Sequence, residues 1–239
     1  MPATQAPKRL TRDQHQAQTR ARLLEAAGTV FALRGFQAAS LEEVAEQAGY
    51  SKGAVYSNFT GKEDLFAALL EQRCHDQLAQ IQAALWAEPL TATRLREVGD
   101  TLGAGIQHDR EWTLLFIEFW ARAARNPELG RRFAAIWQQA RGGLAELIAR
   151  HATDRGVDLP VAPQQLAAAA MALANGLALQ LLADPERVSP QTLGNALGLL
   201  FAGLHAFGDE RADGGPASRE RPASDSSDKS ISNEPGGGG

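Results

Sequence analysis

Leucine and alanine recur at helical spacing along most of the chain, and this periodicity limits most strongly the folds open to it. Val, Ile and Thr nowhere alternate with polar residues for long, so the sequence lacks the pattern of half-buried strands. We therefore predict an all-α fold of about nine helices. Their expected ranges are 12–34, 41–48, 52–59, 62–86, 92–108, 111–125, 127–151, 163–183 and 190–207.

Cap residues mark several of the predicted helix starts. Three Ser or Thr residues are each followed three positions later by Gln or Glu, which is typical of a capping box: Thr11/Gln14, Ser40/Glu43 and Thr60/Glu63. Asn126-Pro127 and Ser189-Pro190 place a cap residue before a proline at the first helical position. Gly35 is expected to end the first helix.

The charge is distributed unevenly. The chain has a formal net charge of -4, but residues 1–62 carry eight Lys and Arg against five Asp and Glu. A basic N-terminal quarter on an acidic remainder is expected of a nucleic-acid-binding module joined to another domain. No apolar run approaches the ~18 residues that cross a bilayer, and no signal peptide is evident. We therefore expect a cytoplasmic protein.

The residues that could support catalysis are scattered. The five histidines show no i, i+4 pairing, and Cys74 and His75 are neighbours that point to different faces of a helix. The single cysteine excludes an internal disulfide and a cysteine-based zinc site. No glycine-rich phosphate loop follows a strand. We predict that the protein is not an enzyme and uses no cofactor or metal.

Residues 41–59 predict two short helices that meet at Gly49. Glycine can take the left-handed conformation of a tight turn, and Ser51 can cap the second helix. Ala45 is small enough for a close approach, and Val55 supplies an apolar contact. This is the helix-turn-helix layout, in which the second helix enters the DNA major groove. An αα-hairpin inside a helical core is the alternative.

The segment from about Thr19 to Leu70 resembles the N-terminal DNA-binding domain of the TetR family of bacterial transcriptional regulators. The resemblance is carried by Gly35-Phe36, Ser40, Gly49, Ser51-Lys52-Gly53, Tyr56, Phe59 and Lys62. Ser57-Asn58 departs from the family pattern, because many relatives carry a large or basic residue and a histidine there. The departure concerns which operator is recognised.

The resemblance implies DNA contacts at Ser40, Ser51, Lys52, Gly53, Ala54, Tyr56, Ser57, Asn58 and Lys62. Ser40 and Tyr56 resemble phosphate contacts, although Tyr56 could instead pack inside the domain. Lys62 is expected to meet a phosphate together with the first amides of its helix. Arg9 and Arg12 belong to a basic extension, residues 1–18, which either follows the DNA backbone or is a solvated tail.

The resemblance also implies the remaining organisation. Residues 19–70 would form the DNA-binding domain and residues 71–208 a ligand-binding and dimerisation domain. Residues 209–239 contain too few hydrophobic residues to build a core, so we expect a disordered tail.

Two apolar helices near the C-terminus carry small residues every fourth position: Ala170, Ala174 and Ala178, then Gly194, Gly198 and Ala202. Helices this apolar must be buried on several sides. A two-fold interface with two helices from each subunit would bury them, and an intrachain core is the alternative.

Aromatic residues gather at helical spacing in the middle of the chain: Trp112, Phe116, Phe119, Trp120, Phe133 and Trp137. They form either a core or a pocket for a lipophilic or aromatic ligand. The family resemblance favours the pocket, with Met171 and Asn175 as further contacts. Glu118 and Arg122, four residues apart, are expected to form a surface ion pair.

These expectations combine into one hypothesis for function: a homodimeric repressor that a small ligand releases from a palindromic operator. The ligand would tilt the long fourth helix and change the separation of the two recognition helices. One alternative is a DNA-binding activator or architectural protein with no ligand pocket. Another is a helical scaffold that does not bind DNA.

Overall fold

A computed structural model describes residues 11–87, 91–156 and 158–213, and these residues form nine α-helices and no strand, as predicted. The bounds are α1 Arg12–Ala38, α2 Leu41–Ala48, α3 Lys52–Asn58, α4 Lys62–Ala87, α5 Ala92–His108, α6 Arg110–Ala123, α7 Pro127–Arg155, α8 Pro163–Ala183 and α9 Thr192–Asp213. The start of the C-terminal tail was placed too early, because α9 continues to Asp213. Residues 214–239, like Arg9 and the rest of residues 1–10, lie outside the described part of the chain.

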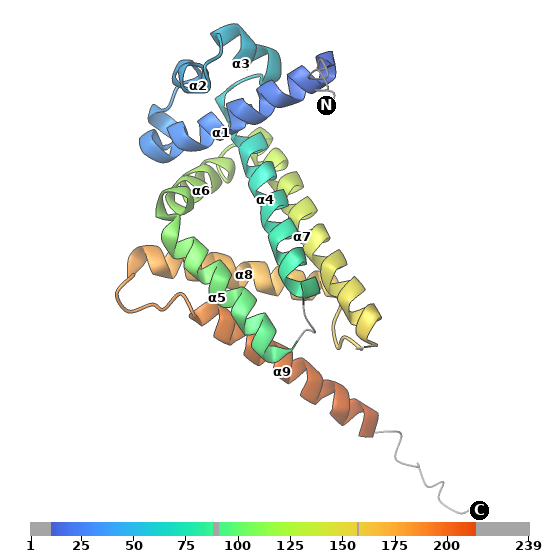
Figure 1. Cartoon of the computed structure of the whole chain (residues 1–239). Coiled ribbons are helices and arrows are strands. Elements are labelled where there is room, and N and C mark those ends of the chain that lie inside the picture. Colours follow the sequence, from blue (N-terminus) through green and yellow to red (C-terminus); the bar gives the residue numbers. More distant parts are fainter. Residues whose placement is uncertain (1–10, 88–90, 157, 214–239) are drawn as a thin grey trace, which may run out of the picture.

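The helices form two groups, one at each end of the molecule, which a pair of long helices connects (Figure 1). At the upper end α1, α2 and α3 pack together, and we call these helices with the start of α4 the N-terminal unit. Helices α4 and α7 run side by side away from it, while α5, α8 and α9 form the lower end. Helix α6 lies between the two ends and contacts α1, α5 and α7.

Helix α1 contains a break at Gly35, where φ is 73° and ψ is 165°. The sequence correctly marked Gly35 as the end of the regular helix, but a short helical segment resumes and continues to Ala38. Glycine adopts this backbone conformation without the steric cost that a Cβ would add. The break turns Phe36 into the core, where its side chain is fully buried.

The side-chain caps explain most helix starts. The capping boxes of Thr11 and Ser40 form as predicted, and Asn126 caps α7 ahead of Pro127. One predicted capping box was wrong. The hydroxyl and amide of Thr60 donate to Asp64 rather than pairing with Glu63. Helix α9 begins at Thr192, two residues later than predicted, but the Ser189 hydroxyl accepts from the Gln191 amide at 3.2 Å, which is the bond expected of the predicted cap.

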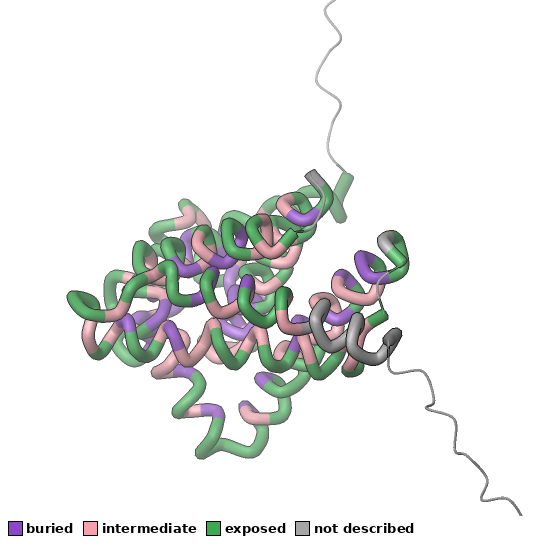
Figure 2. The backbone as a smooth tube through the Cα atoms, turned by 90° about the horizontal axis from the view of Figure 1, so that it is seen from below, coloured by how far each residue is buried: buried purple, intermediate pink, exposed green. Residues whose placement is uncertain are grey.

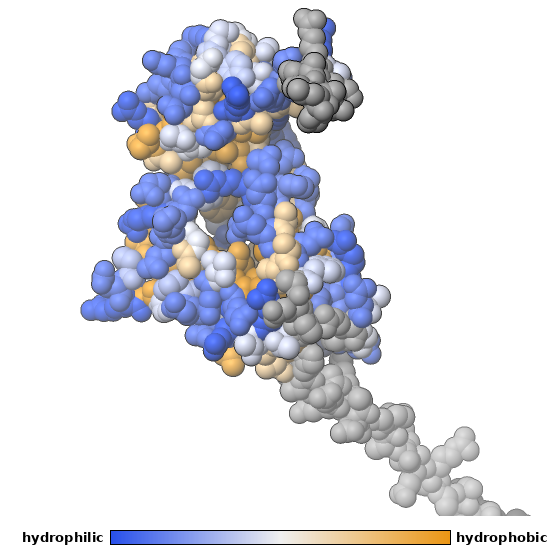
Figure 3. Space-filling model, viewed as in Figure 1, coloured by the Kyte–Doolittle hydropathy of each residue, from blue (hydrophilic) through white to orange (hydrophobic). Residues whose placement is uncertain are grey.

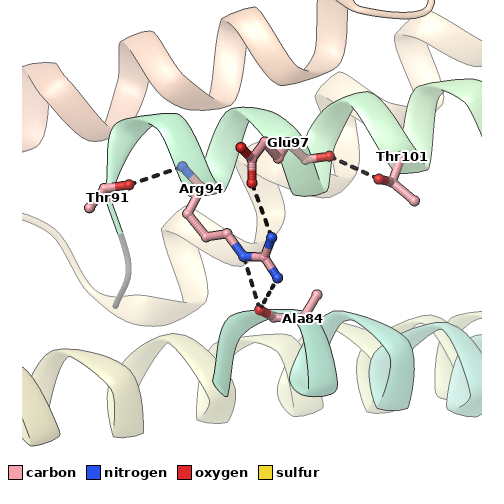
Figure 4. Close-up of polar contacts among 5 residues, drawn as sticks. All are labelled: Ala84, Thr91, Arg94, Glu97 and Thr101. Carbon is pink, nitrogen blue, oxygen red and sulfur yellow. Dashed lines mark hydrogen bonds and ion pairs between the residues drawn. The ribbon is translucent and has the colours of Figure 1, made fainter. Parts of the chain in front are cut away.

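The junction between α4 and α5 is held by one arginine (Figure 4). The Arg94 guanidinium donates twice to the Ala84 carbonyl, at 3.2 and 3.0 Å, and pairs with Glu97 at 3.0 Å. The Thr91 hydroxyl caps the start of α5 by accepting from the Arg94 amide. Because Ala84 lies in the last turn of α4, Arg94 satisfies a carbonyl near the helix end.

The glycine stripe of α9 packs inside the chain, against α5. A Cβ added at Gly194 would lie 2.4 Å from the Arg96 carbonyl oxygen, and one added at Gly99 would lie 2.5 Å from the Gly194 Cα. Gly198 is also buried against α5. The prediction that Gly194 and Gly198 form a dimer interface was therefore wrong, because they let two helices of one chain approach closely. Ala174 similarly packs on the Leu177–Leu181–Leu193 cluster.

By length and composition alone, helix α8 could cross a membrane. This corrects the prediction that no apolar segment of the sequence approaches that length. Only 17% of the 18-residue apolar window of α8 is buried within the chain. Among the residues whose burial is described, the exposed large hydrophobic side chains of α8 and α9 are Leu173, Leu179, Leu199 and Leu200, with Leu199 at 74%. Figure 2 shows how much of the lower helices remains exposed or half-buried. Exposed apolar residues that gather on one face are typical of an interaction surface.

Candidate nucleic-acid interface

Helices α2 and α3 meet in the turn that the sequence predicted. Gly49 is left-handed, with φ 71° and ψ 29°, and the Tyr50 amide donates to the Ala45 carbonyl at 2.9 Å. The Ser51 hydroxyl accepts from the Ala54 amide at 3.3 Å and so caps α3. Val55 is fully buried and fixes the helix on its neighbours.

The rest of α3 faces outward. Among its seven residues only Val55 is buried, and the Tyr56 side chain is 52% exposed, so the alternative that Tyr56 packs inside the domain was wrong. Gly53 and Ala54 have almost no side chain, so little covers the backbone of the first turn of α3, and Ser51 is exposed beside them. Such a short helix is stabilised by its neighbours and can present its exposed residues to a partner.

Lys52, the first residue of α3, forms an ion pair with Glu42 of α2. The Lys52 ammonium also lies 5.8 Å from the centre of the Tyr56 ring. The hydrogen bond between the two side chains raises the pKa of Lys52 and lowers the pKa of Glu42. Both side chains are more than half exposed, so solvent screens this pair.

Ser57 and Asn58 are turned back onto their own helix. The Ser57 hydroxyl donates to the Ala54 carbonyl at 2.9 Å, and the Asn58 side-chain amide donates to the same oxygen at 2.8 Å. The carbonyl of Asn58, at the end of α3, accepts from the Arg20 guanidinium at 3.2 Å. That guanidinium also lies 4.5 Å from the centre of the Phe59 ring.

Arg20 is a contact that the sequence did not reveal. It lies on α1, 38 residues before Asn58, and only the folded arrangement brings the two together. A cation at a helix C-terminus is favourable because the last carbonyls carry partial negative charge. Arg20 therefore holds the end of α3 in place, while Arg12 lies exposed at the start of the same helix α1.

Lys62 has different partners from the phosphate that we predicted. Its ammonium donates to the carbonyls of Gln37 and Ala39, at 2.8 and 3.0 Å, and lies 5.0 Å from the Phe36 ring centre. Two of its three N–H groups are thus used to cap the short segment after Gly35. Lys62 therefore connects α4 to α1, and its predicted contact with a phosphate stays a prediction.

Glu118 and Arg122 do not form the predicted surface pair with each other. The Glu118 carboxylate accepts from the Phe36 amide at 3.1 Å, directly after the Gly35 break. Arg122 pairs with Glu63 of α4 at 3.3 Å and lies 5.5 Å from the Phe36 ring centre. Two side chains of α6 therefore hold the N-terminal unit.

A second pair links α7 to the start of α4. Arg132 of α7 bonds to the Asp64 carboxylate, which also accepts from Thr60. Burial raises the pKa of Asp64, but the hydrogen bonds from Arg132 and Thr60 outweigh this effect and place it below its usual value. The N-terminal unit is thus tied to both α6 and α7 by charged hydrogen bonds.

The six predicted ligand-binding aromatics pack on one another and on the N-terminal unit. Phe116 lies 5.4 Å from Trp137, Phe133 lies 5.6 Å from Trp137, and Trp120 lies 6.1 Å from Phe133. Phe119 lies 4.2 Å and Trp112 5.8 Å from Phe66 of α4. These are stacking distances, and Phe119 and Phe133 are buried, whereas Trp112, Phe116 and Trp137 are half-buried and Trp120 is 40% exposed. Contact between these rings and a ligand stays a prediction.

This aromatic core crosses the boundary predicted at residues 70 and 71. The same cluster contains Leu23 of α1, Val44 of α2 and Phe133 of α7. Met171 and Asn175, predicted as ligand contacts, lie half-buried on α8, which contributes no residue to that cluster among the described positions. The structure therefore does not bring the eight predicted ligand-binding residues together.

The described part of the chain contains hollows on its surface. Figure 3 shows the face hollowed between α6 and α4, with hydrophobic residues in its depth. A separate cavity of about 280 Å³ lies between α1, α4 and α7, with Arg20, Cys74 and His75 in its lining. Burial raises the pKa of the Cys74 thiol to about 11, so little thiolate is present at neutral pH. Among the described residues, no three His, Cys, Asp or Glu side chains group as metal ligands.

Comparison with known families gives two matches that divide the chain in order. A family model described as "Bacterial regulatory proteins, tetR family" matches residues 23–69. One described as "BetI-type transcriptional repressor, C-terminal" matches residues 89–204. Together they match more than half of the chain.

Individual proteins agree with these matches. The HTH-type transcriptional activator FasR of Mycolicibacterium smegmatis is 34% identical over 110 residues, which are 46% of this chain and 48% of FasR. The match therefore spans about half of the length of that relative. A TetR-family regulator from Mesorhizobium loti has the same fold, with a TM-score of 0.65, 24% identity, and coverage of 83% of this chain and 98% of its own.

A further solved structure is similar in fold alone. FadR of Bacillus subtilis, in complex with stearoyl-CoA, has a TM-score of 0.58 and 17% identity, and covers 77% of this chain and 99% of its own.

Proposed function

Because the chain belongs to the TetR family of bacterial transcriptional regulators, which are not enzymes, we propose that it is a cytoplasmic, homodimeric repressor that binds a palindromic operator. The observation that carries this proposal is the outward face of α3. Of the seven residues of that helix only Val55 is buried, so the fold holds the helix in place and leaves Tyr56 and its neighbours for a partner.

The DNA contacts would divide into positioning and reading. Ser40 at the start of α2 and Tyr56 on α3 would bind phosphates, which fix orientation without reading sequence. The N-terminal part of α3, with Ser51, Lys52, Gly53 and Ala54, would face base edges in the major groove. Ser57 and Asn58 would exchange their bonds to the Ala54 carbonyl for contacts with DNA.

The homodimer would form through the exposed leucines of α8 and α9. Leu179 is 49% and Leu199 is 74% exposed in the single chain. Burying a fully exposed leucine stabilises by about 1.5–3 kcal/mol, so burying the exposed part of these two contributes a corresponding fraction of that. The half-buried Ala170 and Ala178 and the exposed Ala202 would lie within or beside this face. A two-fold interface uses each contact twice and matches a palindromic operator.

The ligand would enter the hollow between α6 and α4 rather than the aromatic core. Hydrophobic residues in its depth suit a lipophilic or aromatic molecule, and one such molecule, stearoyl-CoA, is bound by FadR, which is similar in fold alone. A ligand there would lie beside α6, whose Glu118 and Arg122 contact Phe36 and Glu63. A shift of α6 would therefore move the N-terminal unit.

Activation of transcription is the second candidate. FasR is named an activator, while the C-terminal family model is named for a repressor, so the two similarities favour opposite outcomes. Transcription in vitro from a promoter that carries the selected operator would distinguish them. Repression predicts less transcript when the protein is added, and activation predicts more.

The primary experiment is selection of genomic fragments by the purified chain, followed by sequencing of the bound pool. We expect enrichment of a few fragments that share a palindrome. A bound pool without any shared sequence would contradict the proposal. Thermal unfolding of the same protein with a panel of hydrophobic compounds then tests ligand binding, since a ligand of the native state raises the midpoint with concentration.

A further inference from the structure

We propose that Glu42 is a specificity-determining residue, which holds the Lys52 ammonium at the base-reading end of α3 and keeps it from the phosphates of non-operator DNA. The proposal rests on the proposed function, because it assumes that α3 enters the major groove. It assigns a role to a carboxylate that lies outside the expected DNA contacts.

The geometry places Glu42 at the one cation of α3. Lys52 is the first residue of α3, and Glu42 lies in the first turn of α2, so their ion pair spans the helix-turn-helix. The neighbouring carboxylate of Glu43 is already engaged, because it completes the capping box with Ser40 and pairs with Arg34 at 3.4 Å. Glu42 is therefore the acidic residue of α2 whose side chain pairs with the recognition helix α3.

The consequence follows from how proteins bind DNA without sequence preference. Non-specific affinity comes from neutralising phosphates, and each neutralised phosphate steepens the salt dependence by about 0.9 in log–log slope. A lysine paired with Glu42 contributes no net charge to such a complex. The ammonium has three N–H groups, so a paired Lys52 can still donate to O6 or N7 of a guanine.

Other polar side chains on the exposed face of α3 also have partners within the protein, as Lys52 does. Ser57 and Asn58 both donate to the Ala54 carbonyl, so they too have partners within the protein before DNA binds. A sequence that offers no replacement partners gains little from these groups. Specificity of this kind comes from suppressing the wrong complex as well as from favouring the right one.

The test compares Glu42→Gln with Glu46→Gln. Glu46 lies on the same helix, is exposed, and has no ion pair among the described residues, so both variants remove one charge near α3. Binding of a pool of random-sequence duplexes is measured by fluorescence anisotropy between about 50 and 200 mM salt. We expect a slope steeper by about 0.9 for Glu42→Gln alone, which is a roughly threefold larger loss of affinity over that range.

The same substitution made in a Lys52→Gln protein tests whether the effect depends on the Glu42–Lys52 ion pair. In Lys52→Gln protein, Glu42→Gln is expected to leave the slope unchanged, because the ammonium that it releases is absent. Equal slopes for Glu42→Gln and Glu46→Gln in the presence of Lys52, or an effect of Glu42→Gln that persists in Lys52→Gln protein, would overturn the inference alone. A wild-type chain that binds no selected fragment would overturn the proposed function with it.

Discussion

The Glu118 carboxylate accepts a hydrogen bond from a backbone amide 82 residues earlier in the chain. That amide belongs to Phe36, which follows the break at Gly35 and so has lost its place in the regular helix. An orphan donor in a partly buried place needs a partner, and α6 supplies it. The conformation of the N-terminal unit therefore depends on a residue of the C-terminal helices.

Replacing Glu118 with Ala should destabilise the protein and loosen the α1–α2 connection. Leaving a buried donor unpaired costs roughly 1–3 kcal/mol, so the unfolding midpoint should fall. Hydrogen exchange of the Phe36 amide should accelerate more than that of amides in α8. Glu111→Ala, an exposed change on the same helix, is the control, and equal effects of the two variants would contradict this role.

Arg20 should matter for DNA binding through position as well as through charge. Arg20→Gln removes the bond to the Asn58 carbonyl and the stacking on Phe59, so the end of α3 is less firmly held. We expect about a tenfold loss of affinity for a selected operator, or ~1.4 kcal/mol. Arg22→Gln removes the same charge from α1 at an exposed position. If both variants weaken binding equally at matched salt, charge alone explains the effect.

Residue-scale features were predicted well where they depend on near neighbours. Ser40 and Glu43 are three residues apart, and their reciprocal bonds require only a helix start. Lys62 and Arg122 could not be assigned in this way, because their partners, Gln37 and Glu63, come from other helices. A long cationic side chain selects its partner only after the helices have packed.

At the scale of elements, helical periodicity located every described helix, and the predicted ranges of α2, α5 and α8 are the observed ones. Small residues were correctly read as sites of close approach, but their partner helix was not fixed by the pattern. Gly194 faces Gly99 of α5 in the same chain, and both glycines leave room for backbone. A stripe of glycines predicts that another helix packs closely against it, but it does not identify that helix.

The exposed leucines of α9 give a direct test of the dimer. Leu199→Glu places a charge on a 74% exposed position of the proposed interface, and the two-fold symmetry repeats the change in both subunits. We expect a shift from dimer to monomer in sedimentation equilibrium. Leu33→Glu is the control, because Leu33 is 79% exposed but lies on α1 at the other end of the molecule. A dimer that survives Leu199→Glu unchanged would exclude this face.

At the scale of the whole molecule, the aromatic residues join the two ends of the chain. Phe119 lies among Phe36, Phe66 and Phe133, so rings from α1, α4, α6 and α7 form one core. A core and a pocket both remained open for these rings at the level of sequence, since helical spacing is the same for each. Only the packing shows which side chains meet, and here many of the partners of the rings are other rings.

A core shared in this way suits transmission between the ends. Interiors are close-packed, so a displacement of α6 cannot be absorbed within the aromatic cluster and must shift its neighbours. The bonds of Glu118, Arg122 and Arg132 reach the same part of the N-terminal unit. A ligand would act to the extent that it binds one arrangement of α6 better than the other.

Selective DNA binding by the proposed dimer is the most direct test of the central claim. The purified chain is titrated onto a selected operator fragment in the presence of excess random-sequence DNA, and the mass of the complex is measured. The account predicts a saturable complex of an even number of chains, lost when either half-site is scrambled. Binding that random-sequence DNA competes away as efficiently as the operator itself would contradict it.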